Sequence, residues 1–279
     1  MMPEALEFAQ ETARQAGQLL VDLYRQHHTV WHKSSDIDIV TEADLASEEL
    51  IVRAIRSAFP DHRILSEEGL GALNEPRSAQ SSSDGAAGEA PFLWLVDPLD
   101  GTVNYAHGFP CWGVSLALAR RGTVLMALTH DPLLDETYWA ERGGGAMLNE
   151  EPIRVSDVPE LGDALVATGF AYRRSTLTDD NLAEFAAVTP HVQGVRRAGA
   201  AVLDLAYVAA GRLDAYWELH LNPWDWAAGW LLVEEAGGRV TDLQGLAWDL
   251  GKTNLVASNA RLHQGLLQLL RHTECPDTQ

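Results

Sequence analysis

Apolar and polar residues in the first part of the chain alternate with the period of amphipathic helices. Apolar residues fall at every third or fourth position across residues 4–25, so we predict a helix there. The same spacing predicts a second helix over 41–58, which ends before Pro60. Strict alternation over residues 36–40 predicts a short strand just ahead of that helix.

Short apolar runs bounded by turn residues follow, and this is the pattern of buried strands. We predict strands at residues 64–66, 92–96, 113–119, 124–130, 136–140 and 145–148. Residues 71–90, between the first two of these strands, are rich in Ser, Ala and Gly. Because such a composition cannot pack into a core, we predict a mobile surface loop or flap there.

After Pro152 the pattern changes to an alternation of strands and helices. The predicted strands are 164–168, 213–218, 239–241 and 254–258, and the predicted helices are 178–188, 200–210, 224–236 and 260–271. An α/β pattern that follows an α+β pattern predicts two domains. We place an N-terminal α+β domain at 1–152 and a C-terminal α/β domain at 153–279.

The composition narrows the possible partners. The chain has 279 residues with 20 Lys+Arg and 40 Asp+Glu, so its formal net charge is −20. Such a charge argues against binding a nucleic-acid backbone or an anionic membrane. Chemistry on small phosphates stays open, because bound cations can reverse the local sign of an acidic cluster. We recognise neither a signal peptide nor an apolar stretch long enough to span a bilayer, and expect a cytoplasmic protein.

The densest group of chemically active residues lies where an apolar strand leads to two aspartates. Pro98 keeps Asp97 extended. Gly101 permits a turn, so that Asp100 can approach Asp97. The backbone N–H groups of Gly101 and Thr102 would then begin a helical turn, where anions bind. Carboxylates for a hard cation beside amides for a phosphate are typical of phosphoryl transfer, whereas the alternative is a structural turn that caps a helix.

Three further acidic elements can join this pair. Asp44 lies three residues after Thr41, and its structural alternative is a capping box. Glu67 and Glu68 end a strand, where one can point into a site while the other meets solvent, unless both are solvated. Asp225 begins an apolar helix that must be buried, so it needs a partner such as a cation, unless it only complements the helix dipole.

Several other chemistries are excluded by missing motifs. The chain has no Cys-x-x-Cys pair and no His-Glu-x-x-His motif of the kind that binds zinc. It also lacks the glycine-rich loops that bind nucleotides. An aspartyl-phosphate mechanism would place its nucleophile at Pro98, which has none. Ligands made only of oxygen favour Mg²⁺, Ca²⁺ or Mn²⁺.

Taken together and in this order, these elements resemble the inositol monophosphatase family. The matching segments are 38–44, 66–68, 94–110, 147–156, 199–212 and 223–229. They cover nearly the whole chain, and 94–110 and 223–229 are specific. One departure is the interval between Glu67 and Asp97, which the Ser, Ala and Gly tract makes longer than in typical members.

The resemblance implies a layered αβαβα sandwich of the inositol monophosphatase and fructose-1,6-bisphosphatase type, usually a homodimer. It implies inhibition by Li⁺ and dependence on two or three Mg²⁺ ions, for which Mn²⁺ can substitute. The residues expected to hold metal are Glu67, Asp97, Leu99 through its carbonyl, Asp100 and Asp225. The residues expected to act in catalysis are Asp44, Thr102 and Glu67. The residues expected to bind substrate are Asp100, Gly101, Thr102, Ala201, Glu218 and Asp225.

The resemblance further implies hydrolysis of a small phosphate ester, myo-inositol monophosphate first among them. Alternative substrates are fructose 1,6-bisphosphate, 3′-phosphoadenosine 5′-phosphate and histidinol phosphate. The motifs do not separate them, because their residues bind metals and phosphate rather than the alcohol part of the ester. A regulatory binding protein of the same fold is an alternative of another class. The acidic surface argues against direct RNA binding in that case.

Overall fold

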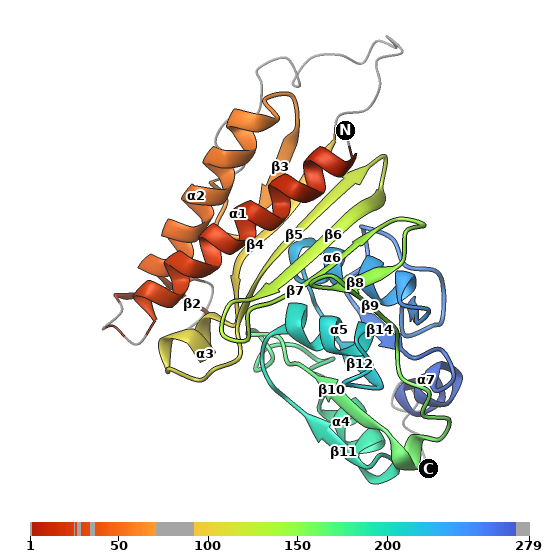
Figure 1. The fold of residues 1–279 in the computed structure, drawn as a ribbon. Helices are drawn as coiled ribbons and strands as arrows, with labels where there is room; N and C mark the ends of the chain where they lie inside the picture. The colour runs from red at the N-terminus through yellow and green to blue at the C-terminus, as the bar shows by residue number, and fades with distance from the viewer. Residues whose placement is uncertain (1, 25, 27–28, 34–36, 71–91, 272–279) are drawn as a thin grey trace, which may run out of the picture.

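The computed structural model describes residues 2–24, 26, 29–33, 37–70 and 92–271, and the loop predicted at 71–90 lies outside them. Two sheets and three layers of helices alternate in the order helix, sheet, helix, sheet, helix (Figure 1). This is the layered arrangement that the resemblance implies. Within the described part of the chain, none of the helices has the length and apolar character needed to cross a bilayer.

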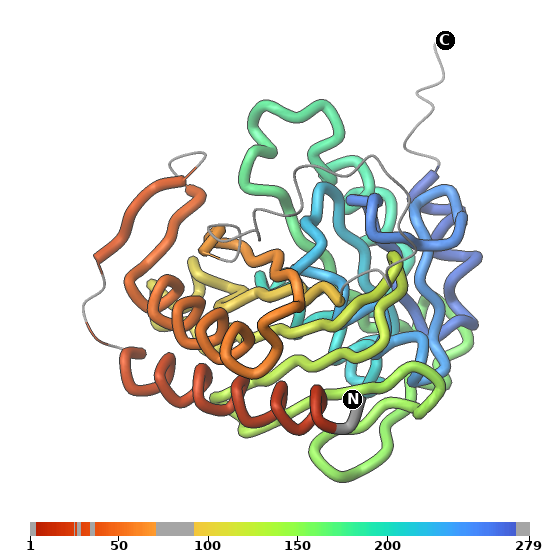
Figure 2. The backbone as a smooth tube through the Cα atoms, turned by 90° about the horizontal axis from the view of Figure 1, so that it is seen from above, coloured from red at the N-terminus to blue at the C-terminus, as the bar shows by residue number. Residues whose placement is uncertain are grey.

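The first layer consists of α1 (Met2–Leu23) and α2 (Glu42–Ala58), which pack side by side on the outer face of the first sheet (Figure 2). Helix α1 buries mainly alanines, such as Ala9 and Ala13, which are fully buried. Small side chains let a helix approach a sheet closely. A short hairpin of β1 (Val30–His32) and β2 (Ile39–Thr41) joins the two helices, and its second strand was predicted as 36–40.

The first sheet has seven strands, of which only β3 and β4 are parallel neighbours. Their order is β3 (Arg63–Ser66), β4 (Leu93–Asp100), β5 (Gly113–Arg120), β6 (Thr123–Asp131), β7 (Glu136–Glu141), β8 (Ala146–Leu148) and β9 (Glu151–Ile153). Strand β4 continues past the predicted end at Val96, but its pairing with β5 is irregular between Asp97 and Asp100. Pro98 lies inside this irregularity, because proline cannot donate a hydrogen bond to the ladder.

The second sheet has five strands of mixed direction. Their order is β11 (Gly194–Arg196), β10 (Leu165–Thr168), β12 (Ala215–Glu218), β14 (Leu255–Ser258) and β13 (Arg239–Thr241). Helices α4 (Leu182–Val188) and α7 (His263–Arg271) pack together on its outer side (Figure 1). Short 3₁₀ turns at Leu161–Asp163 and Thr189–His191 complete this half of the chain.

Two predicted helices begin later than expected. Helix α4 was predicted from residue 178, but Asn181 has a φ of 70°, which no α-helix tolerates. Helix α7 was predicted from residue 260, but Ala260 has a φ of 67°. Strand β11 was not predicted at all, since its three residues carry no distinct pattern. Left-handed residues and very short edge strands leave little trace in hydrophobic periodicity.

The middle layer consists of α5 (Ala201–Ala209) and α6 (Pro223–Glu235), which contact both sheets. Gly229 lets the two helices touch, because a Cβ atom there would lie 2.4 Å from Cβ of Leu205. Trp226 is fully buried and packs edge-on against Trp248. Because this layer packs against both sheets, the two halves of the chain share a core. The division into domains 1–152 and 153–279 stays a prediction.

We expect Gly229→Ala to lower the free energy of unfolding by about 1–3 kcal/mol, because the added methyl group has no space between α5 and α6. Urea unfolding measures this value. Gly162→Ala is the matched control, because a Cβ atom there meets nothing within 4 Å. The packing argument fails if the two variants are equally stable.

Candidate active site

One cavity of about 370 Å³ opens where the end of β4 faces the starts of α5 and α6. Its lining is rich in acids: Asp38, Glu67, Asp97, Asp100, Asp204, Glu218 and Asp225. Leu99, Gly101, Thr102 and Ala201 also line it. The structure therefore brings together the site residues expected from the sequence, with Asp44 joined to them through Thr102.

The irregular end of β4 and the residues that follow it, 97–102, form a segment that we call the β4 turn, and its backbone conformation depends on glycine. Asp97 is only 1% exposed, and its Oδ1 accepts a hydrogen bond from the Leu99 N–H at 3.2 Å. Gly101 has a φ of 90°, and a Cβ atom there would lie 2.8 Å from the Cys111 carbonyl oxygen. Glycine is therefore required. The short helix α3 (Thr102–Ala106) starts directly after it.

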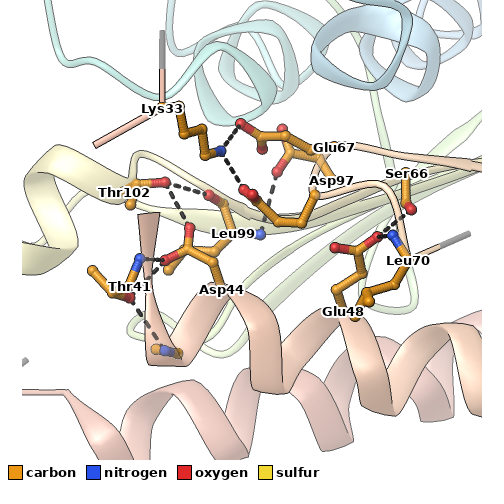
Figure 3. A network of polar contacts seen from close by, with 12 residues as sticks. Lys33, Thr41, Asp44, Glu48, Ser66, Glu67, Leu70, Asp97, Leu99 and Thr102 are labelled. Atoms are coloured by element: carbon orange, nitrogen blue, oxygen red, sulfur yellow. Dashed lines mark hydrogen bonds and ion pairs between the residues drawn. The ribbon is translucent and has the colours of Figure 1, made fainter. Parts of the chain in front are cut away.

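Asp44 forms the capping box that was one alternative and also contacts Thr102, which lines the cavity (Figure 3). Its Oδ2 accepts hydrogen bonds from the N–H and Oγ1 of Thr41 at 2.8 and 2.6 Å, which completes a capping box. Its Oδ1 accepts a bond from Thr102 Oγ1 at 2.8 Å. Asp44 is fully buried, and burial raises the pKa of its carboxyl although these bonds oppose the rise.

The expectation that one glutamate meets solvent while the other points into the site is wrong for Glu68, whereas the side chain of Glu67 is 22% exposed. Lys33 Nζ lies 3.1 Å from Glu67 Oε1 and also pairs with Glu68, and the Glu68 side chain is only 7% exposed. Burial by itself lowers the pKa of Lys33, but the charges of the two glutamates raise it above its ordinary value. Lys33 comes from the β1–β2 hairpin, so this pairing depends on tertiary structure.

Backbone amides hold the two remaining aspartates. The Val202 N–H at the start of α5 donates to Asp100 Oδ2 at 2.7 Å. The Asn222 N–H donates to Asp225 Oδ2 at 2.7 Å, because Asp225 is the third residue of α6 in a capping box. Helices from the second half of the chain therefore meet the β4 turn from the first half.

Burial dominates the electrostatics of this cluster, and the crowding of like charges adds to it. Burial raises the pKa of Glu67 to about 6, and that of Asp100 to about 7. Burial and then the charges of Glu67 and Asp100 raise the pKa values of Asp97 and Asp225 well above their usual range. A positive ion at the centre would reverse these shifts.

The chemistry of these oxygen donors fits a hard divalent cation, although their present arrangement is not a finished metal site. Within the described residues, no three His, Cys, Asp or Glu side chains converge at the spacing needed to hold a metal. Several carboxylate oxygens accept N–H bonds instead, as the preceding contacts show. The ligand roles of these residues therefore stay predictions.

The cavity is also lined by two charged residues that the sequence did not single out, Asp204 and Arg197. Asp204 lies on α5 and is 2% exposed, and burial raises the pKa of its carboxyl well above the usual value. Arg197 lowers the pKa values of Asp204 and Glu218, although burial still raises that of Glu218 to about 7. Gly169 lies directly against Glu218, since a Cβ atom there would lie 2.0 Å from Glu218 Oε2. A lone acid in an otherwise apolar helix was the available signal for Asp204.

The raised pKa values make the stability of the protein depend on pH. Asp100 holds its proton in the folded state up to about pH 7, whereas the unfolded chain releases it near pH 4. Its contribution to the free energy of unfolding therefore falls as the pH rises between these values. His263 acts in the opposite direction, because burial lowers its pKa to about 4.

We therefore compare wild type with Asp100→Asn in metal-free buffer, so that the histidine contributions cancel. As the pH rises from 5 to 7.5, the free energy of unfolding should fall by about 2–3 kcal/mol less in the variant than in wild type. Urea unfolding over this pH range measures the difference. Identical pH profiles would show that Asp100 titrates normally in the folded protein.

Comparison with known proteins places this arrangement in a family. A family model described as the inositol monophosphatase family matches residues 1–274. The Nus factor SuhB of Pseudomonas aeruginosa is 41% identical over 97% of this chain and 97% of its own length. The inositol-1-monophosphatase of Synechocystis is 40% identical over 96% of this chain and 89% of its own length.

The fold agrees with the sequence match. The solved inositol monophosphatase from Anabaena (Nostoc) is 38% identical, with a TM-score of 0.82 over 99% of this chain and 98% of that one. The layered α+β fold expected from the sequence is confirmed. The chain therefore belongs to the inositol monophosphatase family.

Proposed function

We propose that this protein is a Mg²⁺-dependent phosphomonoesterase that hydrolyses inositol monophosphates to inositol and inorganic phosphate. Family membership supports a phosphatase, and the Synechocystis relative carries the name inositol-1-monophosphatase. The observation that carries the proposal is the cavity in which carboxylates crowd beside the Asp44–Thr102 pair. Such a cavity offers oxygen ligands on one side and a proton acceptor on the other.

The carboxylates and one carbonyl would hold the metal ions. One ion would bind Glu67, Asp97 and the Leu99 carbonyl, and a second would bind Asp97, Asp100 and Asp225. A divalent cation bound there lowers the pKa of a bound water and stabilises charge on the leaving oxygen. Mn²⁺ suits the same ligands. The mutual rise in the pKa values of these acids supports a cation as their partner.

The protein's own residues would manage the proton of the attacking water. Water oxygen attacks phosphorus as the bond from phosphorus to the alcohol oxygen breaks. The water proton moves to Thr102 Oγ1 while the hydroxyl proton of Thr102 moves to Asp44, 2.8 Å away. The alcohol oxygen takes a proton from solvent. Burial raises the pKa of Asp44, which favours the protonated carboxyl that this transfer produces.

The alcohol would bind on the side of the cavity that Ala201, Glu218 and Arg197 line. A carboxylate accepts hydrogen bonds and a guanidinium donates them, so together they suit a ring that carries several hydroxyl groups. Phosphate would meet the N–H groups of Gly101 and Thr102. We also propose that Li⁺ inhibits the reaction and that the protein is a cytoplasmic homodimer.

A second candidate function is regulation of transcription. The Pseudomonas relative at 41% identity carries the name Nus factor SuhB, and this observation favours such a role. The net charge of −20 argues for a protein partner rather than direct contact with RNA. This role and phosphatase activity are compatible in one chain.

Asp97→Asn should lower Mg²⁺-dependent hydrolysis of inositol 1-phosphate by more than about 100-fold, because Asp97 would contact both ions. Phosphate release by the purified protein measures activity, and circular dichroism checks folding. A folded variant with wild-type activity would refute the proposal. The same assay on fructose 1,6-bisphosphate, 3′-phosphoadenosine 5′-phosphate and histidinol phosphate identifies the preferred ester.

Gly169→Ala should raise the KM for inositol 1-phosphate roughly tenfold, because its methyl group displaces the Glu218 carboxylate. Hydrolysis of p-nitrophenyl phosphate, whose leaving group has no hydroxyl ring, should change less than about threefold. Gly162→Ala again serves as the control. Equal losses on both esters would mean that Glu218 does not recognise the alcohol.

A further inference from the structure

Helix α2 carries three fully buried polar side chains on one face, namely Asp44, Ser47 and Glu48. Their spacing of three and four residues aligns them along the same side of the helix. Buried polar groups need hydrogen-bond partners. Each of the three finds its partner in a segment that forms the active site, and none of these segments is adjacent to α2 in sequence except the Thr41 cap.

Asp44 and Ser47 hold the turn after β4. Asp44 accepts the hydrogen bond from Thr102 Oγ1 at 2.8 Å. Ser47 Oγ donates to the carbonyl oxygen of Pro98 at 2.7 Å. Pro98 lies between Asp97 and Leu99, both expected to hold metal. Helix α2 is therefore fixed to this turn at two points.

Glu48 holds the other acidic turn. Its Oε1 accepts hydrogen bonds from Ser66 Oγ and from the Leu70 N–H, the latter at 2.9 Å (Figure 3). These two donors lie on either side of Glu67. Arg56, two turns further along α2, donates to the Leu70 carbonyl oxygen at 2.8 Å. The turn that carries Glu67 is thus bound to the helix at both of its ends.

We propose that Glu48 is a positioning residue, which fixes Glu67 at the distance from the β4 turn that metal binding requires. Helix α2 acts as the rigid spacer, because the contacts of Asp44, Ser47 and Glu48 lie within about one helical turn of one another. Glu48 touches neither metal nor substrate in this role. The proposal rests on the proposed function, since it concerns the same metal site.

The decisive variant is Glu48→Met, which keeps the side-chain length but removes both acceptor oxygens. Thermal unfolding at increasing Mg²⁺ concentration, without substrate, gives the midpoint for metal binding. We expect this midpoint to rise roughly tenfold or more, as for other residues that orient metal ligands. Glu48→Gln keeps an acceptor oxygen and should restore the midpoint to within about threefold of wild type.

Glu49→Met is the matched control, because Glu49 is the next residue of α2 but is exposed and pairs only with Arg53 among the described side chains. It should leave the Mg²⁺ midpoint unchanged. If Glu48→Met only lowers the metal-free unfolding temperature and leaves the midpoint within twofold of wild type, the positioning role is overturned.

A milder variant covers the case in which Glu48→Met does not fold. Ser66→Ala removes one of the two donors to Glu48 and should raise the midpoint about threefold, whereas an unchanged midpoint overturns the proposal. Phosphate release is measured separately. If the wild-type protein binds Mg²⁺ but hydrolyses no phosphate ester, only the proposed function is refuted. If the unfolding temperature of the wild-type protein does not change with Mg²⁺ concentration, the positioning role is refuted.

Discussion

Repulsion among buried carboxylates is the constraint on which the rest of this site depends. Glu67, Asp97, Asp100 and Asp225 come from three separate segments. Burial raises the pKa values of all four, and the charges of neighbouring carboxylates, Glu218 in the case of Asp100, add to the rise. Without a positive partner, carboxylates buried this close together would move apart or stay protonated. The rest of the fold therefore has to hold these carboxylates together, and a bound cation would offset their repulsion.

The layered fold supplies this enforcement from both sides. Helix α2, in the first layer, forms hydrogen bonds with the β4 turn and with the turn that carries Glu67. Helices α5 and α6 reach the same place from the middle layer, where Gly229 allows them to pack closely. Neither half of the chain contains the whole cluster. The packing of α6 against the first sheet thus brings Asp225 to the other three acids.

Local patterns in the sequence predicted most of the elements and most of the acidic residues of the site. Periodicity identified α1, α2 and α6, because their burial is one-sided or complete over many residues. The order of motifs placed Asp97 and Asp225 in one site. Their shared cavity agrees with that placement, while their ligand roles stay predictions.

The features that escaped prediction depend on contacts between distant segments. Lys33 meets Glu67 only after the hairpin folds over the sheet. Glu48 lies at helical spacing from buried Ile51 and Ile55, but the sequence does not reveal which groups satisfy its carboxylate there. Pattern alone therefore finds groups that do chemistry more readily than the groups that hold them in place.

Capping and catalysis are compatible roles for the acids of this site, since a carboxylate has two oxygens. Asp44 gives one oxygen to Thr41 and the other to Thr102. Asp97, Asp100 and Asp225 each have one oxygen fixed by a backbone N–H, from Leu99, Val202 and Asn222. Such bonds favour the charged form and hold the side chain in one orientation. A capping hydrogen bond therefore fixes the orientation of a carboxylate. For this reason a capping pattern in a sequence does not argue against a catalytic role.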